Sequence, residues 1–159
     1  MIWRIVFLLA GLLALTPTQA DVSEDRRALI QELFPAATVI EDKLPDLPAY
    51  PVYQLQELLG YAFESVDHSP IQGFAGKPIS LLIGMDTKGR FTGIRVLNHH
   101  EPVFLHGIGE EPMLEFLNQY EGRSLREQII VNTSNSSRSG QTSDGNLVYF
   151  DGVSQATVS

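Results

Sequence analysis

The chain has 159 residues, with 11 Lys and Arg against 19 Asp and Glu, a formal net charge of -8 and no cysteine. The absence of cysteine excludes disulfide scaffolds, zinc–thiolate sites, cysteine-ligated iron–sulfur clusters and catalytic thiols. The acidic balance argues against nucleic acid as a partner, because phosphate binding needs a basic face. The length and the hydrophobic fraction of 43% predict one compact domain with a real core.

Residues 1–20 have the pattern of an export signal. Arg4 supplies the positive charge, residues 5–15 form an unbroken apolar run, and Ala20 is a small residue at the expected cleavage position. This run is shorter than the roughly 20 residues that span a bilayer. The sequence therefore predicts a signal peptide over residues 1–20, with an uncleaved N-terminal anchor as the alternative. Residues 21–159 would then form a periplasmic domain, either released or tethered to the inner membrane.

The first predicted helix begins at the capping residue Ser23 and ends at Pro35. Its apolar stripe, at helical spacing, is formed by Leu29, Ile30, Leu33 and Phe34. Residues 44–51 hold three prolines and predict an extended connector. Residues 52–55 and 58–66 follow as a predicted strand pair around a short turn.

A second hairpin is predicted from residues 79–85 and 91–97, because residues 86–89 form a polar turn with a glycine at its end. Pro112 then favours the start of a helix, and Gly122 its end. The predicted buried stripe of this helix consists of Met113, Leu114, Phe116, Leu117 and Tyr120.

Residues 132–146 contain no apolar side chain and predict a loop. Residues 147–150 return as a short strand. Together the elements predict a single compact domain of the α+β class, with antiparallel hairpins and two or three helices.

The last nine residues, DGVSQATVS, follow this strand directly. Ser154 is typical of a helix N-cap, and the backbone N–H groups at such a helix start favour an anion such as a phosphate. The hydroxyl of Thr157 would lie close by. From spacing alone, a plain turn followed by a capping serine remains the commoner explanation.

The segment resembles the flavinylation motif of the FMN-binding domain family, which runs approximately D-G-x-S/T-G-A-T. In that family a flavin transferase joins FMN through its phosphate to the hydroxyl of the final threonine. The resemblance implies that FMN is bound covalently at Thr157. The residues that it implies as recognition context are Asp151, Gly152, Ser154 and Ala156. The departure from the pattern is Gln155, where the family usually has glycine.

Related flavin domains carry a similar His-x-Glu loop with glycines after the same hairpin. Here the loop comprises residues 98–109, and the resemblance implies cofactor contacts from His100, Glu101, Phe104, Gly107 and Gly109. Glycines would let the backbone approach a planar ring, and Phe104 could pack against it. Two alternatives stay open: a zinc or copper site built from His99, His100, Glu101 and His106, or histidines with no role beyond a polar loop.

Over residues 52–131 the chain looks like the periplasmic N-terminal part of the NosR/NirI family. That resemblance implies an electron-carrying or redox-sensing flavin domain in nitrous oxide respiration, which supports nitrous oxide reductase or regulates its expression. The implied partners are the flavin transferase and a membrane or periplasmic redox protein. The pattern favours a non-enzymatic domain, because no catalytic acid, base or nucleophile stands out. The alternatives are a sensory or partner-binding module without flavin, and a copper-handling protein.

Overall fold

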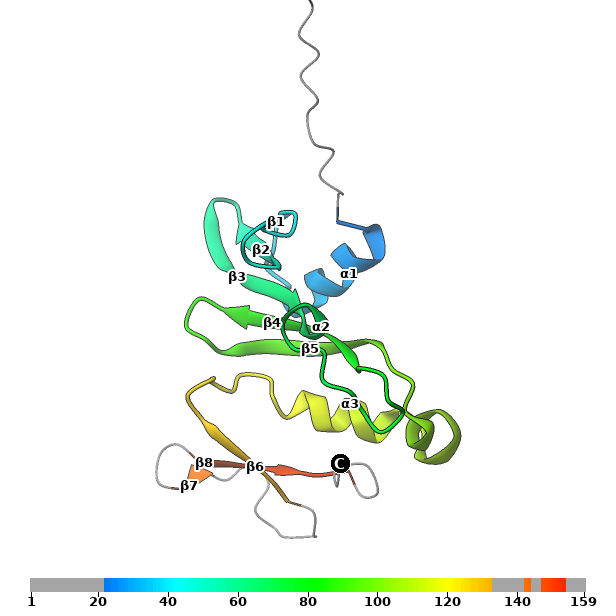
Figure 1. The fold of residues 1–159 in the computed structure, drawn as a ribbon. Helices are drawn as coiled ribbons and strands as arrows, with labels where there is room; N and C mark the ends of the chain where they lie inside the picture. Colours follow the sequence, from blue (N-terminus) through cyan, green and yellow to red (C-terminus); the bar gives the residue numbers. More distant parts are fainter. Residues whose placement is uncertain (1–21, 133–141, 144–146, 154–159) are drawn as a thin grey trace, which may run out of the picture.

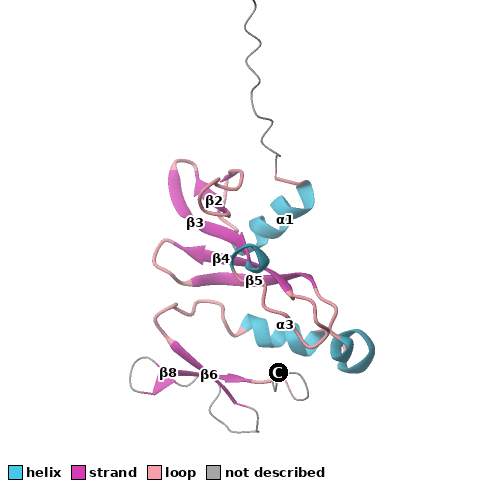
Figure 2. Ribbon diagram, in the orientation of Figure 1, coloured by secondary structure: helices cyan, strands magenta, loops and turns pink. Residues whose placement is uncertain are grey.

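The computed structural model describes residues 22–132, 142–143 and 147–153 (Figures 1 and 2). Its helical segments are α1 (Glu24–Leu33), α2 (Ser65–His68), the π-helical turn η1 (Phe104–Ile108) and α3 (Glu111–Asn118). Its strands are β1 (Val39–Ile40), β2 (Ala49–Gln54), β3 (Glu57–Glu64), β4 (Ser80–Asp86), β5 (Phe91–Asn98), β6 (Gln128–Asn132), β7 (Thr142–Ser143) and β8 (Leu147–Asp151). Strands β1 to β5 form an antiparallel sheet in sequential order, and a second sheet has the order β6-β8-β7. The predicted α+β class is confirmed.

The two longer helices cover opposite faces of the five-stranded sheet, and the second sheet packs on the far side of α3 (Figure 1). Gly84 and Gly93, paired between β4 and β5, face α1. A Cβ on Gly84 would lie only 3.1 Å from the Cβ of Leu33, so glycine lets the helix approach closely. The next pair, Ile83 and Ile94, faces the opposite way and packs with residues of α3.

A hydrophobic core therefore lies on each face of the sheet. Leu82 is fully buried in the core beneath α1, together with Ile30 and Val52. Its neighbour Ile83 packs in the other core, which holds Met113 and Leu117 of α3. Because both faces are covered, β4 has a continuous apolar sequence where a half-buried strand would alternate.

The first predicted helix is confirmed. The Ser23 hydroxyl accepts the Arg26 N–H at 3.4 Å, and Ile30 and Leu33 are buried. The helix ends at Leu33, two residues before Pro35, whose ring is incompatible with a continuing helix.

The first hairpin differs from the prediction at both ends. Strand β2 begins at Ala49, so Pro51 lies inside the strand, where its carbonyl accepts the Glu41 N–H at 3.0 Å. The turn is Leu55–Gln56 rather than the next pair, because Gln54 pairs with Glu57. Two-residue hairpin loops need positive φ, and Leu55 has φ 56°. Strand β3 stops at Glu64, and the predicted strand residues 65–66 form the start of α2.

The second hairpin is confirmed. Oδ1 of Asp86 accepts the N–H groups of Lys88 and Arg90, both at 2.8 Å, and Gly89 supplies φ 75°. One carboxylate oxygen accepts two backbone hydrogen bonds, and one glycine adopts the left-handed conformation. Because both residues are typical of turns, this turn could be predicted from the sequence alone.

Helix α3 begins at Glu111 and buries Met113 and Leu117, as the prediction required, but Leu114 is 39% exposed. Between α3 and β6 the pair Ser124 and Glu127 makes a capping-box bond, from the serine N–H to the glutamate Oε2 at 3.2 Å. The chain then enters β6 instead of a helix.

The second sheet adds parallel pairing to the antiparallel hairpins that the sequence predicts. Strands β6 and β8 are parallel, with Ile129 beside Val148 and Val131 beside Phe150. Within the predicted loop of residues 132–146, Asn132 ends β6 and Thr142–Ser143 forms β7, antiparallel to β8. The other residues of that loop lie outside the described part of the chain.

Residues 1–20 also lie outside the described residues, so the signal peptide and the anchor remain predictions. Among residues 22–132, 142–143 and 147–153, no helix combines the length and apolar character needed to cross a membrane.

Candidate functional site

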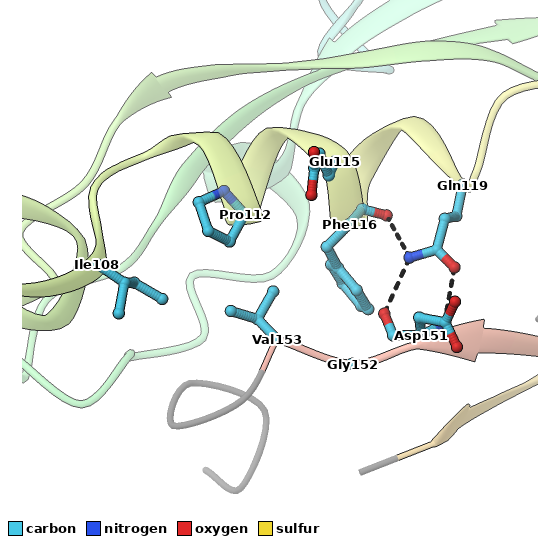
Figure 3. A pocket seen from close by; sticks show the side chains of 8 residues that line it. All are labelled: Ile108, Pro112, Glu115, Phe116, Gln119, Asp151, Gly152 and Val153. Carbon is cyan, nitrogen blue, oxygen red and sulfur yellow. Dashed lines mark hydrogen bonds between the residues drawn. The ribbon is translucent and has the colours of Figure 1, made fainter. Parts of the chain in front are cut away.

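The predicted modification segment starts in a groove between α3 and the end of β8 (Figure 3). The groove has a volume of ≈ 470 Å³. It is lined by Ile108, Pro112, Glu115, Phe116, Gln119, Asp151, Gly152 and Val153. Two regions that the sequence pointed to, the loop of residues 98–109 through Ile108 and the motif through residues 151–153, therefore meet at one hollow beside α3.

Three contacts fix the first residues of this segment. The side chain of Gln119 hydrogen-bonds the backbone of Asp151, and the Gly152 N–H donates to the Asn132 carbonyl at 2.9 Å. Val153 is buried, with 9% of its surface exposed. The remaining predicted residues of the motif, Ser154, Ala156 and Thr157, lie outside the described residues.

A second, apolar cavity of ≈ 240 Å³ adjoins the groove. It is lined by Ile79, Leu81, Phe104, Met113, Phe116, Leu117 and Val153. Phe116 and Val153 line both hollows. Phe104, predicted to pack against a flavin ring, is a buried wall residue of this cavity.

The loop after β5 is closed by a hydrogen bond between its two ends. The side chain of His99 is only 5% exposed, and its Nε2 lies 3.0 Å from Oε1 of Glu110. Its Nδ1 accepts the N–H of Glu101 at 3.4 Å. This bond assigns the ring proton to Nε2, which donates it to the carboxylate. His100 and His106 are exposed.

Glu101, predicted to contact the cofactor, is a buried carboxylate with 5% exposure. Its Oε1 accepts the N–H of Ala75 at 3.3 Å and packs against Gly73. It therefore ties the loop after β5 to the segment between α2 and β4. Gly107 lies within η1, and Gly109 follows it with φ 81°.

The structure does not assemble the metal site that the sequence left open as an alternative. His99, His100, Glu101 and His106 all lie in the described part of the chain, and no three His, Asp or Glu residues in that part come together to hold a metal ion.

The charged side chains that line the described part of the groove are acidic. Among the described residues, the charged ones that line it are Glu115 and Asp151, and none of the described lining residues is Lys or Arg. Beside it, burial raises the pKa of Tyr120, whose ring makes edge contacts with Phe116 and Phe150. The described part of the groove thus offers apolar walls and hydrogen-bonding groups, and its charges are negative.

Sequence reasoning missed the contribution of α3 to this site. Its apolar stripe was interpreted as core alone, yet Phe116 faces both hollows. Gln119 and Glu115 carried no signal, because a polar residue near a helix end is ordinarily solvated.

Comparison with known proteins gives a consistent picture. Residues 73–159 match the FMN-binding domain family. The chain is 36% identical over 98% of its length to Regulatory protein NosR of Pseudomonas aeruginosa, of which it covers 21%. It is 31% identical over 81% of its length to the protein of the same name from Stutzerimonas stutzeri, of which it covers 17%. Protein NirI of Paracoccus denitrificans is 26% identical over 73% of this chain, which covers 17% of it. The chain thus spans about a fifth of the length of these relatives.

Proposed function

The chain belongs to the FMN-binding domain family, and from this premise we propose that it carries FMN on Thr157 through a phosphoester. The domain would serve as an electron carrier or redox sensor outside the cytoplasm. The flavin supplies the redox chemistry, and the protein supplies attachment, orientation and electrostatics. The resemblance to NosR and NirI extends the proposal to nitrous oxide respiration, with a membrane or periplasmic redox protein as partner.

The observation that carries this proposal is the place where the motif begins. Asp151, Gly152 and Val153 form part of the groove wall. Thr157 lies four residues beyond Val153, so its Cα lies within about 14 Å of the Val153 Cα, the reach of a fully extended chain. A group esterified to its hydroxyl can therefore return to the groove.

The hollows suit the two halves of a flavin ring. The volume of ≈ 470 Å³ lies in the range of cofactor sites. Phe116 offers an aromatic edge, and the adjoining cavity is apolar, as the dimethylbenzene half of the ring requires. The carboxylate of Glu115 lies on the groove side, where the polar half of the ring could hydrogen-bond.

The charges of the groove favour covalent attachment. A free FMN phosphate carries close to two negative charges at neutral pH, and the carboxylates of Glu115 and Asp151 would repel it. A phosphodiester carries a single negative charge and needs no cation to hold it in place. Esterification thus retains the flavin where the described groove residues provide no ion pair.

The attachment requires an activated donor. The Thr157 Oγ attacks the phosphorus of an FMN unit held in a phosphoanhydride, as in flavin adenine dinucleotide. The new phosphoester bond forms as the anhydride bond breaks, the nucleotide monophosphate leaves with the bonding electron pair, and the hydroxyl proton passes to a base. Nothing is oxidised or reduced in this step. The flavin transferase is the proposed catalyst.

The test is covalent flavin in the full chain. We expect the chain, co-expressed with a bacterial flavin transferase, to stay yellow after denaturation and to gain the mass of FMN less one water. Thr157→Val should lose this adduct, and Ser159→Ala, a matched change two residues away, should keep it. An equal adduct in Thr157→Val would move the attachment elsewhere. Flavin released by denaturation would refute the ester, and wild-type protein without flavin would favour a module of another kind.

A further inference from the structure

The amide of Gln119 binds the first residue of the motif on both its polar backbone atoms (Figure 3). Its Nε2 donates to the Asp151 carbonyl at 2.9 Å, and its Oε1 accepts the Asp151 N–H at 2.7 Å. Gln119 lies just beyond the end of α3, so this pair of bonds joins the helix to the end of β8 across 32 residues of sequence.

The strand geometry explains why a side chain makes these bonds. The Gly152 N–H points toward β6, where the Asn132 carbonyl accepts it. Backbone groups alternate between the two edges of a strand, so those of Asp151 point to the opposite edge. At that edge the described pairing of β7 with β8 is at Leu147 and Val148. Gln119 supplies at Asp151 the donor and acceptor that another strand would have supplied.

Only a primary amide can do this with one side chain. Glutamine offers an N–H donor and a carbonyl acceptor side by side, like a peptide unit. A glutamate at position 119 would still accept from the Asp151 N–H, but its charge would face the Asp151 carbonyl oxygen. A leucine of similar size would offer neither group.

We propose that Gln119 is a positioning residue for flavin attachment, which holds the segment that presents Thr157 to the transferase. This inference rests on the proposed function. The two Gln119–Asp151 hydrogen bonds (the clamp), the bond at Gly152 and the burial of Val153 place the last anchor four residues before Thr157. The anchors therefore limit how far from the groove the Thr157 hydroxyl can lie when the transferase binds the domain.

The size of the effect follows from chain reach. If the anchors fail as far back as the buried Phe150, Thr157 lies seven residues beyond the last anchor, and the reach grows from about 14 Å to about 25 Å. If the hydroxyl can reach any point within that distance, the volume open to it rises about sixfold. If the segment behaves as a flexible chain, the effective concentration of the hydroxyl falls about twofold. Loss of the clamp should raise the transferase KM for the acceptor chain by about two- to sixfold, with kcat unchanged.

The experiment measures transferase kinetics on the full chain with flavin adenine dinucleotide as donor. The variants are Gln119→Leu and Gln119→Glu, and the matched control is Gln56→Leu, an exposed glutamine in the β2–β3 turn. We expect the acceptor KM to rise in both variants, at least as much for glutamate as for leucine, and to stay unchanged in the control. Exchange of the Asp151 amide proton should accelerate in the same two variants.

Each other outcome has a distinct meaning. A wild-type adduct with unchanged KM in both Gln119 variants would overturn this inference and leave the proposed function standing. A rise in KM no larger than the factor expected from the fraction of unfolded acceptor chain, measured by circular dichroism under the assay conditions, would assign Gln119 a purely structural role and overturn it too. A wild-type chain that takes no flavin would overturn both proposals.

Discussion

Replacing Phe150 by leucine tests whether aromatic packing holds the second sheet to α3. The Phe150 side chain is 1% exposed. Its ring centroid lies 4.7 Å from that of Tyr120 and 6.2 Å from that of Phe116, at interplanar angles of 90° and 83°. Edge contacts of this kind contribute about 0.5–1.5 kcal/mol each beyond the area that they bury. Leucine keeps most of the apolar area but loses both contacts, so the free energy of unfolding should fall by about 1–3 kcal/mol.

Urea unfolding followed by far-UV circular dichroism measures this loss. Tryptophan fluorescence would not report it, because the one tryptophan, Trp3, lies in the predicted signal segment. The slope with denaturant should stay the same, since the same surface is exposed on unfolding. Phe150→Ala should cost about 3–5 kcal/mol, a large part of the 5–15 kcal/mol typical of a domain.

The control is Tyr149→Leu, at the adjacent and only half-buried position of β8, which alternation places on the other face of the strand. We expect this change to cost less than Phe150→Leu. Equal losses for the two variants, or no loss at Phe150, would refute the argument that the aromatic contacts of Phe150 with Phe116 and Tyr120 stabilise this sheet.

Two further predictions concern buried polar groups. Oγ1 of Thr92 is buried and makes no hydrogen bond within the described part of the chain, so Thr92→Val should raise the free energy of unfolding by about 1 kcal/mol; a lower urea midpoint would contradict this. Burial raises the pKa of Tyr120 above its usual 10.0, so the folded chain keeps a proton that the unfolded chain releases, and stability should fall as the pH rises above about 10. Tyr120→Phe should lose less stability between pH 8 and pH 11, measured by urea midpoints, because other groups titrate alike in both proteins; equal losses would contradict the assignment.

The candidate site was partly predictable. The DGVSQAT segment predicts a flavin attachment at Thr157, and the glycine-containing loop was the second region predicted to contact the cofactor. The groove brings Ile108 of that loop to Asp151, which connects the two. The role of Glu101 was not predictable, because its partners Gly73 and Ala75 lie far upstream in the sequence. The sequence alone does not show whether a glutamate side chain is buried or solvated.

The sequence by itself determined what depends on neighbouring residues. The capped helix α1, the hairpin of β4 and β5 and the start of α3 near Pro112 all follow from periodicity and turn chemistry within a few residues. The position of the first turn was off by one residue, because the pairing of Gln54 with Glu57 selects it.

Only the tertiary structure decided which distant segments meet. The parallel pairing of β6 with β8, the α3 face shared by two hollows, and the binding of Asp151 by Gln119 join residues far apart in the chain. Their physical origin is the burial of apolar surface on both sides of α3 together with the satisfaction of backbone groups at a strand edge. Both are set by the whole chain at once, so no local pattern encodes them.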